Sequence, residues 1–231
     1  MALHLSLDLP TDKIVWDVGH QSYTHKILTG RKDGFASLRK FGGMSGFPKT
    51  DESDCDCFNT GHSSTSISAG LGLAMARQIT GDDYHVVSVI GDGALTGGMA
   101  YEALNNAAQI RKNFIIVLND NTMSISKNVG GVSEMLSNIR SSDSYYDLKD
   151  SVANTLYKLP NGDKLVESIK KKKSNLKQII FPGQMFESMG ISYLGPVNGH
   201  DIDKLIKIFR IAKRIDTVSY THLTLPTKLE V

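Results

Sequence analysis

One continuous segment, residues 86 to 121, constrains the fold more than any other part of the chain. Its sequence, VVSVIGDGALTGGMAYEALNNAAQIRKNFIIVLNDN, predicts a strand, a Gly-Asp-Gly turn, a helix of small residues, a second strand and a polar strand end. The two strands of such a unit run parallel, which brings their carboxyl ends to one edge of the sheet. Asp92 and Asn121 follow those two ends, so we expect their oxygen atoms to meet around one cation.

The side chains at this edge indicate magnesium. Mg²⁺ prefers octahedral oxygen coordination and commonly keeps phosphates and water among its ligands. The Asp92 carboxylate, the Asn121 amide carbonyl and a backbone carbonyl near Met123 would therefore suffice. Gly91 and Gly93 carry no side chain and let the backbone come close to phosphates. The segment thus predicts a magnesium-diphosphate site.

The alternation of strands and helices predicts a doubly wound α/β domain, with a mostly parallel sheet and helices on both faces. The site is expected at the carboxyl ends of the strands. We predict a strand over residues 13 to 16, and another over residues 191 to 194 that is followed by a turn at Gly195-Pro196 and a helix to about residue 215. Residues 133 to 160, rich in Ser and Asp, are expected to form a flexible excursion.

Two further places could touch a ligand, and the residues alone leave their roles open. His20 follows a predicted strand end, where its imidazole could exchange a proton near neutral pH or could merely pack. Gly61, His62 and Ser63 precede a predicted helix, whose apolar residues recur at helical spacing: Ile67, Leu71, Met75 and Ile79. The amides at such a helix start suit an anion or a polar part of a cofactor, although most Ser and Thr caps only begin helices.

The composition is that of an ordinary globular domain. The 231 residues are 40% hydrophobic and 22% charged with a formal net charge of +2, so nothing indicates nucleic acid. The run Lys170 to Lys173 is typical of a solvated helix face. No segment approaches the roughly 20 apolar residues of a membrane span, and the start MALHLSLDLP makes a poor signal peptide. We therefore expect a cytoplasmic protein with no nucleic-acid or membrane partner.

The two cysteines, Cys55 and Cys57, are followed by His62 at a spacing that could belong to a metal site. A structural zinc site needs four such ligands, and the chain has no second cysteine pair. We expect two reduced thiols of no functional importance.

Five segments carry a specific resemblance to a known family. They are WDVGHQSYTHKILTGR from Trp16, GHSSTSISAGLGLA from Gly61, IGDGALTGGMAYEALN from Ile90, VLNDNTMSISKNVGG from Val117 and FESMGISYLGPVNGHD from Phe186. Together they resemble the 1-deoxy-D-xylulose-5-phosphate synthase family of transketolase-like enzymes. The first two segments are far more specific than Gly-Asp-Gly, which several thiamine enzymes share.

The resemblance implies thiamine diphosphate and Mg²⁺ as cofactors. It implies metal ligands at Asp92, Asn121 and Met123, and a catalytic role for His20. It also implies cofactor contacts at His20, Gly61, His62, Ser63, Gly93, Ala94, Asn121 and Met123.

The resemblance also implies a reaction. The family condenses pyruvate and D-glyceraldehyde 3-phosphate, with loss of CO2, to 1-deoxy-D-xylulose 5-phosphate, a precursor of isoprenoids, thiamine and pyridoxal. Full-length members are expected to be homodimers. The glutamate that activates the cofactor lies in the family's next domain, and Glu102 is rejected for that role because it lies on the helix at the diphosphate side. We therefore expect a chain that is truncated at both ends relative to the family and inactive by itself.

The end of the chain departs from the family pattern. SYTHLTLPTKLEV from Ser219 stands where the family continues with a strand and a stretch rich in lysine and glycine. We predict that residues 1–218 form the thiamine diphosphate-binding domain and that residues 219–231 are a non-native tail outside the fold.

Two alternatives to the synthase stay open at this point. One is another thiamine diphosphate enzyme of the transketolase type, which shares the Gly-Asp-Gly element. The other is a non-catalytic module that binds a diphosphate.

Overall fold

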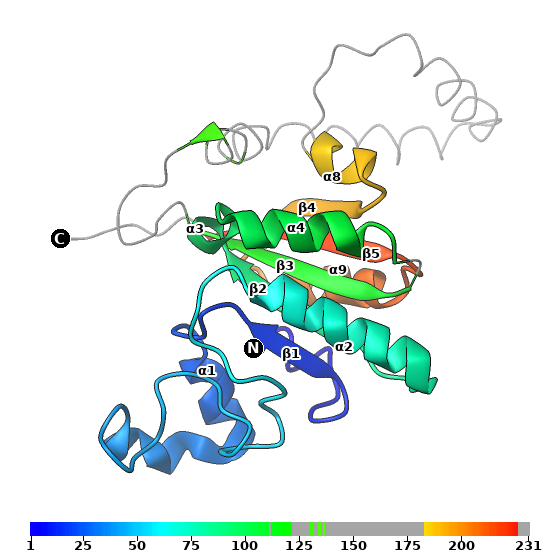
Figure 1. Cartoon of the computed structure of the whole chain (residues 1–231). Coiled ribbons are helices and arrows are strands. Elements are labelled where there is room, and N and C mark those ends of the chain that lie inside the picture. The colour runs from blue at the N-terminus through cyan, green and yellow to red at the C-terminus, as the bar shows by residue number, and fades with distance from the viewer. Residues whose placement is uncertain (111, 122–129, 132–133, 135, 137–182, 226–231) are drawn as a thin grey trace, which may run out of the picture.

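The computed structural model contains a five-stranded sheet (Figure 1) and describes residues 1–110, 112–121, 130–131, 134, 136 and 183–225. The sheet order is β1-β2-β3-β5-β4, and every strand pairing in this described part is parallel. The strands are β1 (Lys13–Trp16), β2 (Val86–Gly91), β3 (Phe114–Asp120), β4 (Ser192–Asn198) and β5 (Val218–Thr224). The predicted fold class is confirmed, and β1 has the predicted bounds.

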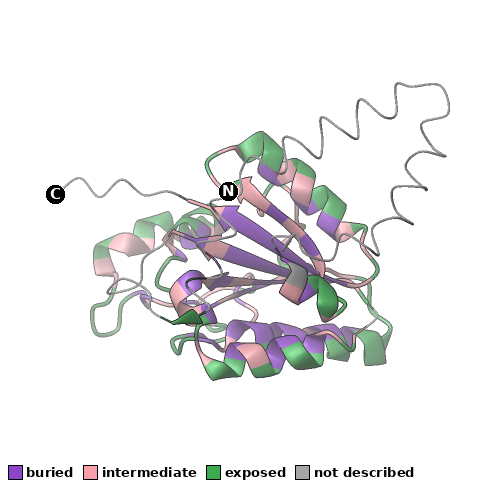
Figure 2. Cartoon of the chain, turned by 90° about the horizontal axis from the view of Figure 1, so that it is seen from above, coloured by how far each residue is buried: buried purple, intermediate pink, exposed green. Residues whose placement is uncertain are grey.

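Helices cover both faces of the sheet because successive strand residues point to opposite sides. On β3, Phe114, Ile116 and Leu118 join the core beneath α2 (Ser66–Thr80) and α4 (Gly98–Ala107). The alternate residues Ile115 and Val117 join the core beneath α9 (Ile202–Lys213). Figure 2 shows the buried strands between helices that expose their outer faces. The continuous apolar run of β3 is thus that of a strand covered on both sides.

Shorter elements complete the described chain. The segment after β1 forms α1 (Tyr23–Lys26), a π-helical turn η1 (Ile27–Arg31) and a 3₁₀ helix η2 (Lys32–Ser37). Two further short helices are α3 (Asp92–Leu95), at the end of β2, and α8 (Gln184–Ser188), before β4. Among the helices described, none is both long and apolar enough to cross a membrane.

The helix predicted after Gly93 is divided into α3 and α4. Gly97 lies between them with extended backbone (φ −75°, ψ 141°), and a Cβ atom there would lie 2.2 Å from the Ser64 hydroxyl. Ser64 donates that hydroxyl to the Ala94 carbonyl at 2.7 Å. The helix therefore breaks where the loop before α2 packs against it.

The apolar residues at helical spacing in α2 do not all face the core. Ile67 and Leu71 are buried, but Met75 is 49% exposed and Ile79 is 83% exposed. The buried face turns instead through Gly70, Ala74 and Arg77. Gly70 packs tightly, since a Cβ atom there would lie 2.1 Å from the Ser88 hydroxyl on β2. The buried face of α2 thus runs through Gly70, Ala74 and Arg77 and not through Met75 and Ile79.

The end of the chain differs most from the expectation. β4 continues through the predicted Gly195-Pro196 turn to Asn198, with an irregular register between Leu194 and Val197. The prediction that residues from Ser219 lie outside the fold is wrong for 219–224, which form β5 between β3 and β4. The non-native origin of residues 219–231 stays a prediction. The predicted excursion at 133–160 and the lysine run fall almost entirely outside the described residues.

Candidate functional site

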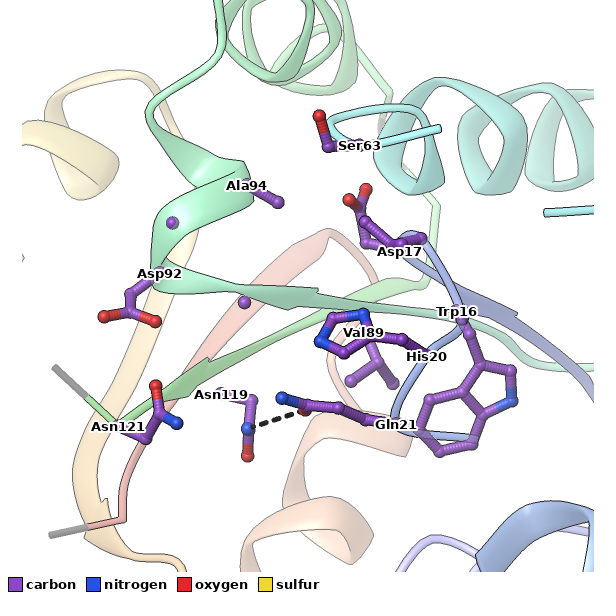
Figure 3. A pocket seen from close by; sticks show the side chains of 14 residues that line it. Trp16, Asp17, His20, Gln21, Ser63, Val89, Asp92, Ala94, Asn119 and Asn121 are labelled. Atoms are coloured by element: carbon purple, nitrogen blue, oxygen red, sulfur yellow. Dashed lines mark hydrogen bonds between the residues drawn. The ribbon is translucent and has the colours of Figure 1, made fainter. Parts of the chain in front are cut away.

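A cavity of about 620 Å³ opens at the carboxyl ends of β1, β2 and β3 (Figure 3). Three parts of the chain line it: the segment that follows β1, the loop before α2, and the ends of β2 and β3. The lining residues are Trp16, Asp17, Val18, Gly19, His20, Gln21, Ser63, Val89, Gly91, Asp92, Gly93, Ala94, Asn119 and Asn121. The cavity lies where a doubly wound fold places its ligand site.

Most of the predicted site residues meet in this cavity. Those that line it are His20, Ser63, Asp92, Gly93, Ala94 and Asn121. Gly61 and His62 immediately precede Ser63 and are exposed, but they are not among the lining residues. Met123 lies outside the described residues. The structure therefore brings these six residues to one cavity, while the cofactor and metal roles of all the predicted site residues stay predictions.

Asp92 and Asn121 lie on the same side of the cavity, where Figure 3 shows the carboxylate and the amide facing each other. Asp92 begins α3 and is 2% exposed. Its burial, together with the neighbouring Asp120 carboxylate, raises the pKa of Asp92 to about 6. A buried carboxylate beside another one is costly to ionise without a cation, so this pair favours cation binding.

The donor set fits magnesium better than a softer metal. Among the described residues, no group of three His, Cys, Asp or Glu side chains could hold a metal ion by itself. A cation at Asp92 would therefore complete its shell with amide or backbone oxygen atoms and with oxygen atoms of a ligand, which is typical of Mg²⁺ bound with phosphates. Cys55 and Cys57 are unbridged thiols away from the cavity lining.

Two glycines leave space that a ligand could fill. A Cβ atom built on Gly91, at the end of β2, meets no atom within 4 Å, and the same holds for Gly61 before α2. Gly91 has extended backbone (φ −81°, ψ 156°), which any residue can adopt. Its lack of a side chain is therefore not required by the backbone, and it keeps the cavity wall open toward a bound group.

His20 follows a strained connection. Val18 has φ 56° and Gly19 has φ 93°. The left-handed region costs a branched residue such as Val18 about 1–2 kcal/mol, and strain of this kind concentrates at functional sites. His20 is exposed, and its side chain lines the cavity (Figure 3). The ring is thus accessible to a ligand.

Asp17 is a site residue that sequence reasoning did not single out. It is 8% exposed, and its two carboxylate oxygens accept hydrogen bonds from the Ser64 amide (2.7 Å) and the Ser66 amide (2.9 Å). These bonds satisfy amides at the start of α2 and fix the loop that carries Ser63. Its position directly after β1 was the available signal, but its partners lie almost fifty residues further on.

Gln21 and Asn119 were also missed. The Asn119 side-chain amide donates to the Gln21 side-chain carbonyl at 3.4 Å, which joins the segment after β1 to the end of β3 across the cavity. Asn119 lies two residues before the predicted metal ligand Asn121, but no feature of the sequence indicates that it meets Gln21.

Comparison with known proteins identifies relatives over nearly the whole chain. A family model described as 1-deoxy-D-xylulose-5-phosphate synthase matches residues 1–224. The synthase of Lachnoclostridium phytofermentans is 53% identical over 223 residues, which are 96% of this chain and 36% of that protein. The synthase of Carboxydothermus hydrogenoformans is 54% identical over 92% of this chain and 34% of that protein. The chain thus spans about a third of the length of these curated relatives.

Solved structures show the same fold at lower identity. Transketolase from Campylobacter jejuni superposes with a TM-score of 0.67 at 21% identity, over 96% of this chain and 32% of that one. Transketolase from Leishmania mexicana gives 0.63 at 19% identity, over 92% and 28%. These likenesses bear on the fold, whereas the similarity at about 50% identity bears on the family.

Proposed function

This chain belongs to the 1-deoxy-D-xylulose-5-phosphate synthase family, and we propose that its cavity is the magnesium- and diphosphate-binding half of a thiamine diphosphate site. The observation that carries the proposal is the meeting of Asp92 and Asn121 at the ends of two adjacent parallel strands. The buried carboxylate supplies the charge, and the open backbone at Gly91 supplies the space.

The chain's own residues have separate roles in this proposal. Asp92 and Asn121, with the backbone of Met123, hold Mg²⁺. The backbone of Gly93 and Ala94 lies against the phosphates, and the loop Gly61-His62-Ser63 contacts the cofactor from the start of α2. When bound, thiamine diphosphate supplies the carbanion chemistry, while the protein binds and orients it.

We assign His20 to proton handling. Its exposed imidazole lines the same cavity as Asp92 and Asn121 but lies apart from them in Figure 3, and an imidazole can hold or release a proton near neutral pH. The strained turn at Val18 and Gly19 directs the chain to this point. His20 would therefore act on the reacting end of the bound molecules rather than on the metal.

The activity of the whole protein is part of the proposal. The parent enzyme condenses pyruvate with D-glyceraldehyde 3-phosphate to 1-deoxy-D-xylulose 5-phosphate, as a cytoplasmic homodimer that contacts neither nucleic acid nor membrane. This chain corresponds to about a third of such an enzyme. Because it contributes one half of the cofactor site, we expect negligible turnover from the chain alone.

Calorimetric titration of thiamine diphosphate into the chain, with and without Mg²⁺, tests this function. We expect heat that depends on Mg²⁺ and disappears in Asp92→Ala, which removes the carboxylate ligand. Gly91→Ala should fold normally and bind at least tenfold more weakly, because its methyl group enters the space left for the phosphates. Gly72→Ala is the matched control, since Gly72 is exposed on α2 and also meets no atom within 4 Å.

Two outcomes would contradict the proposal. One is a folded wild-type chain that releases no heat with thiamine diphosphate and Mg²⁺ at millimolar concentration. The other is equal binding by Gly91→Ala and Gly72→Ala, which would place the ligand elsewhere.

A further inference from the structure

A cluster of buried charged residues lies outside the cavity, between α1, η1 and the loop of residues 44–60. We call it the α1 charge cluster: His25, Lys26, Arg31, Glu52 and Asp56. His25 is 1% exposed, Lys26 is 0% exposed and Asp56 is 4% exposed. Lys26 donates to Glu52 at 2.5 Å, and Arg31 forms a two-pronged contact with Asp56 at 2.6 and 2.9 Å. The function proposed above uses none of these residues.

Asp56 joins the helical segment to the loop. One carboxylate oxygen accepts from His25 Nε2 at 2.8 Å, and the other accepts from the Lys49 backbone amide at 2.9 Å. Burial by itself would raise the pKa of Asp56, but the hydrogen bonds from His25 and Arg31 hold that pKa well below its usual range. The carboxylate is thus charged and saturated with donors from both sides.

Glu52 repeats this arrangement four residues earlier. It accepts from Lys26 on α1 and from the Ser45 backbone amide at 2.6 Å. The backbone of the loop is therefore fixed at Ser45 and at Lys49 by carboxylates whose other partners are the cations of α1 and η1.

The loop of residues 44–60 is also in close contact with Gly19, the residue before His20. Pro48 precedes Lys49, and its carbonyl accepts from the Thr60 amide at 3.4 Å. A Cβ atom on Gly19 would lie 2.4 Å from Pro48 Cδ and 2.4 Å from Thr60 Oγ1, so the loop lies in close contact with Gly19. Gly19 leads directly into His20, and its left-handed backbone (φ 93°) places the imidazole at the cavity.

A second contact leads from the cluster to the cavity. The His25 ring packs against the Trp16 ring with 5.4 Å between centroids, and Trp16 lines the cavity next to His20. His25 is also held from its other side by His4, whose Nε2 lies 3.1 Å from His25 Nδ1.

We propose that Asp56 is a positioning residue for His20, acting through Lys49, Pro48 and Gly19. Buried ion pairs contribute little to the stability of a fold, because desolvation cancels most of the attraction, and in some proteins buried polar groups instead specify one conformation. The α1 charge cluster holds the backbone at Ser45 and Lys49, and the same loop is in close contact with Gly19. The cluster is therefore placed to hold this segment in one conformation. This inference rests on the proposed function, because the proton-handling role of His20 is part of that proposal.

Amide hydrogen exchange on the full chain tests this inference without any ligand. The Gly19 amide donates to the Asp17 carbonyl at 2.5 Å and the Ser22 amide to the Gly19 carbonyl at 3.2 Å, so both report on the segment around His20. We expect Asp56→Asn to speed exchange at Gly19 and Ser22 at least tenfold relative to the amides of β2 and β3. Arg31→Lys, which keeps the charge and loses the two-pronged contact, should do the same to a smaller extent.

Arg77→Gln is the control for a general loss of stability that does not involve the α1 charge cluster. Arg77 is buried and donates to the Tyr84 and Asn113 carbonyls at 2.6 and 2.5 Å, near the opposite ends of β2 and β3 from the cavity. It should destabilise the chain while exchange at Gly19 and Ser22 changes no more than in the strands. If Asp56→Asn does not fold, Arg31→Lys decides.

The inference is overturned if a folded Asp56→Asn or Arg31→Lys chain loses protection at Lys49 but keeps it at Gly19 and Ser22. A matching effect in Arg77→Gln would overturn it as well, because the segment would then report only general stability. Titration of thiamine diphosphate with Mg²⁺ separates the two proposals: absence of binding to the wild-type chain counts against the proposed function and leaves the exchange result unaffected.

Discussion

At the scale of single residues, Asp92 shows a stability cost that a bound cation would remove. Its pKa is about 6 in the folded chain against 3.8 as the ordinary value. A raised pKa means that the folded state favours the protonated form, so the contribution of Asp92 to stability is present below pH 4 and is lost as pH rises through 6. Above that pH the ionised carboxylate is a local cost, which is common at functional sites.

We therefore predict that Asp92→Asn stabilises the protein without Mg²⁺. The gain in free energy of unfolding should be near zero at pH 4 and reach about 2 kcal/mol at pH 8, because two pKa units correspond to at most roughly 3 kcal/mol. Urea unfolding of both chains between pH 4 and 8 measures it. A constant difference across this range would mean that Asp92 is not the titrating group.

The residue scale also shows what the sequence could predict. Asp92 and Asn121 follow predicted strand ends, and topology alone brings them together. Asp17 follows a strand end in the same way, but its role depends on Ser64 and Ser66, whose amides reach it only after the loop has folded back. Local sequence thus predicts residues that chain topology brings together, and misses those joined by a long irregular loop.

At the scale of secondary structure, the start of α2 depends on Asp17. The residue immediately before the helix makes no side-chain cap, and the Asp17 carboxylate, which directly follows β1, accepts hydrogen bonds from the Ser64 and Ser66 amides instead. Hydrogen bonds to a charged group contribute about 1.5–3 kcal/mol each when buried. Because Asp17 follows a strand of the sheet, the start of α2 is stabilised only when that strand is in place.

We predict that Asp17→Ala lowers the free energy of unfolding by about 3 kcal/mol, because it leaves two amides at the start of α2 without acceptors. Asp201→Ala is the matched control: Asp201 caps α9 by accepting from the Lys204 amide at 3.0 Å, but at an exposed site. Its loss should be clearly smaller. Urea denaturation of the two variants compares them, and equal losses would show that Asp17 is an ordinary surface cap.

Element prediction succeeded where a pattern has one structural solution. The apolar run of residues 114–118 has no polar face, so it has to lie inside a covered sheet. Met75 and Ile79 have helical spacing too, yet they are exposed, because the close contact at Gly70 turns the other face of α2 to the sheet. The face of α2 that packs on the sheet depends on how closely the helix backbone can approach the strands. Hydrophobic periodicity does not contain this information.

At the scale of the whole molecule, β5 connects two parts of the sheet, and the family match extends to its last residue, 224. It pairs with β3 on one side and with β4 on the other, and β4 has no other partner among the described strands. Tyr220 is fully buried and stacks on Phe186 of α8 with 3.9 Å between ring centroids. The segment VSYTHLT is rich in branched and aromatic residues, which suit a strand at almost any buried position.

A chain that ends at Val218 should therefore lose cooperative unfolding. Removing residues 219–231 takes away the strand between β3 and β4, so β4 loses its partner among the described strands. A domain is normally stable by only roughly 5–15 kcal/mol, so we expect the loss of this strand to abolish the cooperative transition. A chain that ends at Leu225 keeps β5 and should unfold like the full chain. Near-ultraviolet circular dichroism during urea titration distinguishes them. An unchanged cooperative transition in the shorter chain would show that residues 219–224 contribute nothing to the stability of the fold. That result would agree with the prediction of a tail outside the fold.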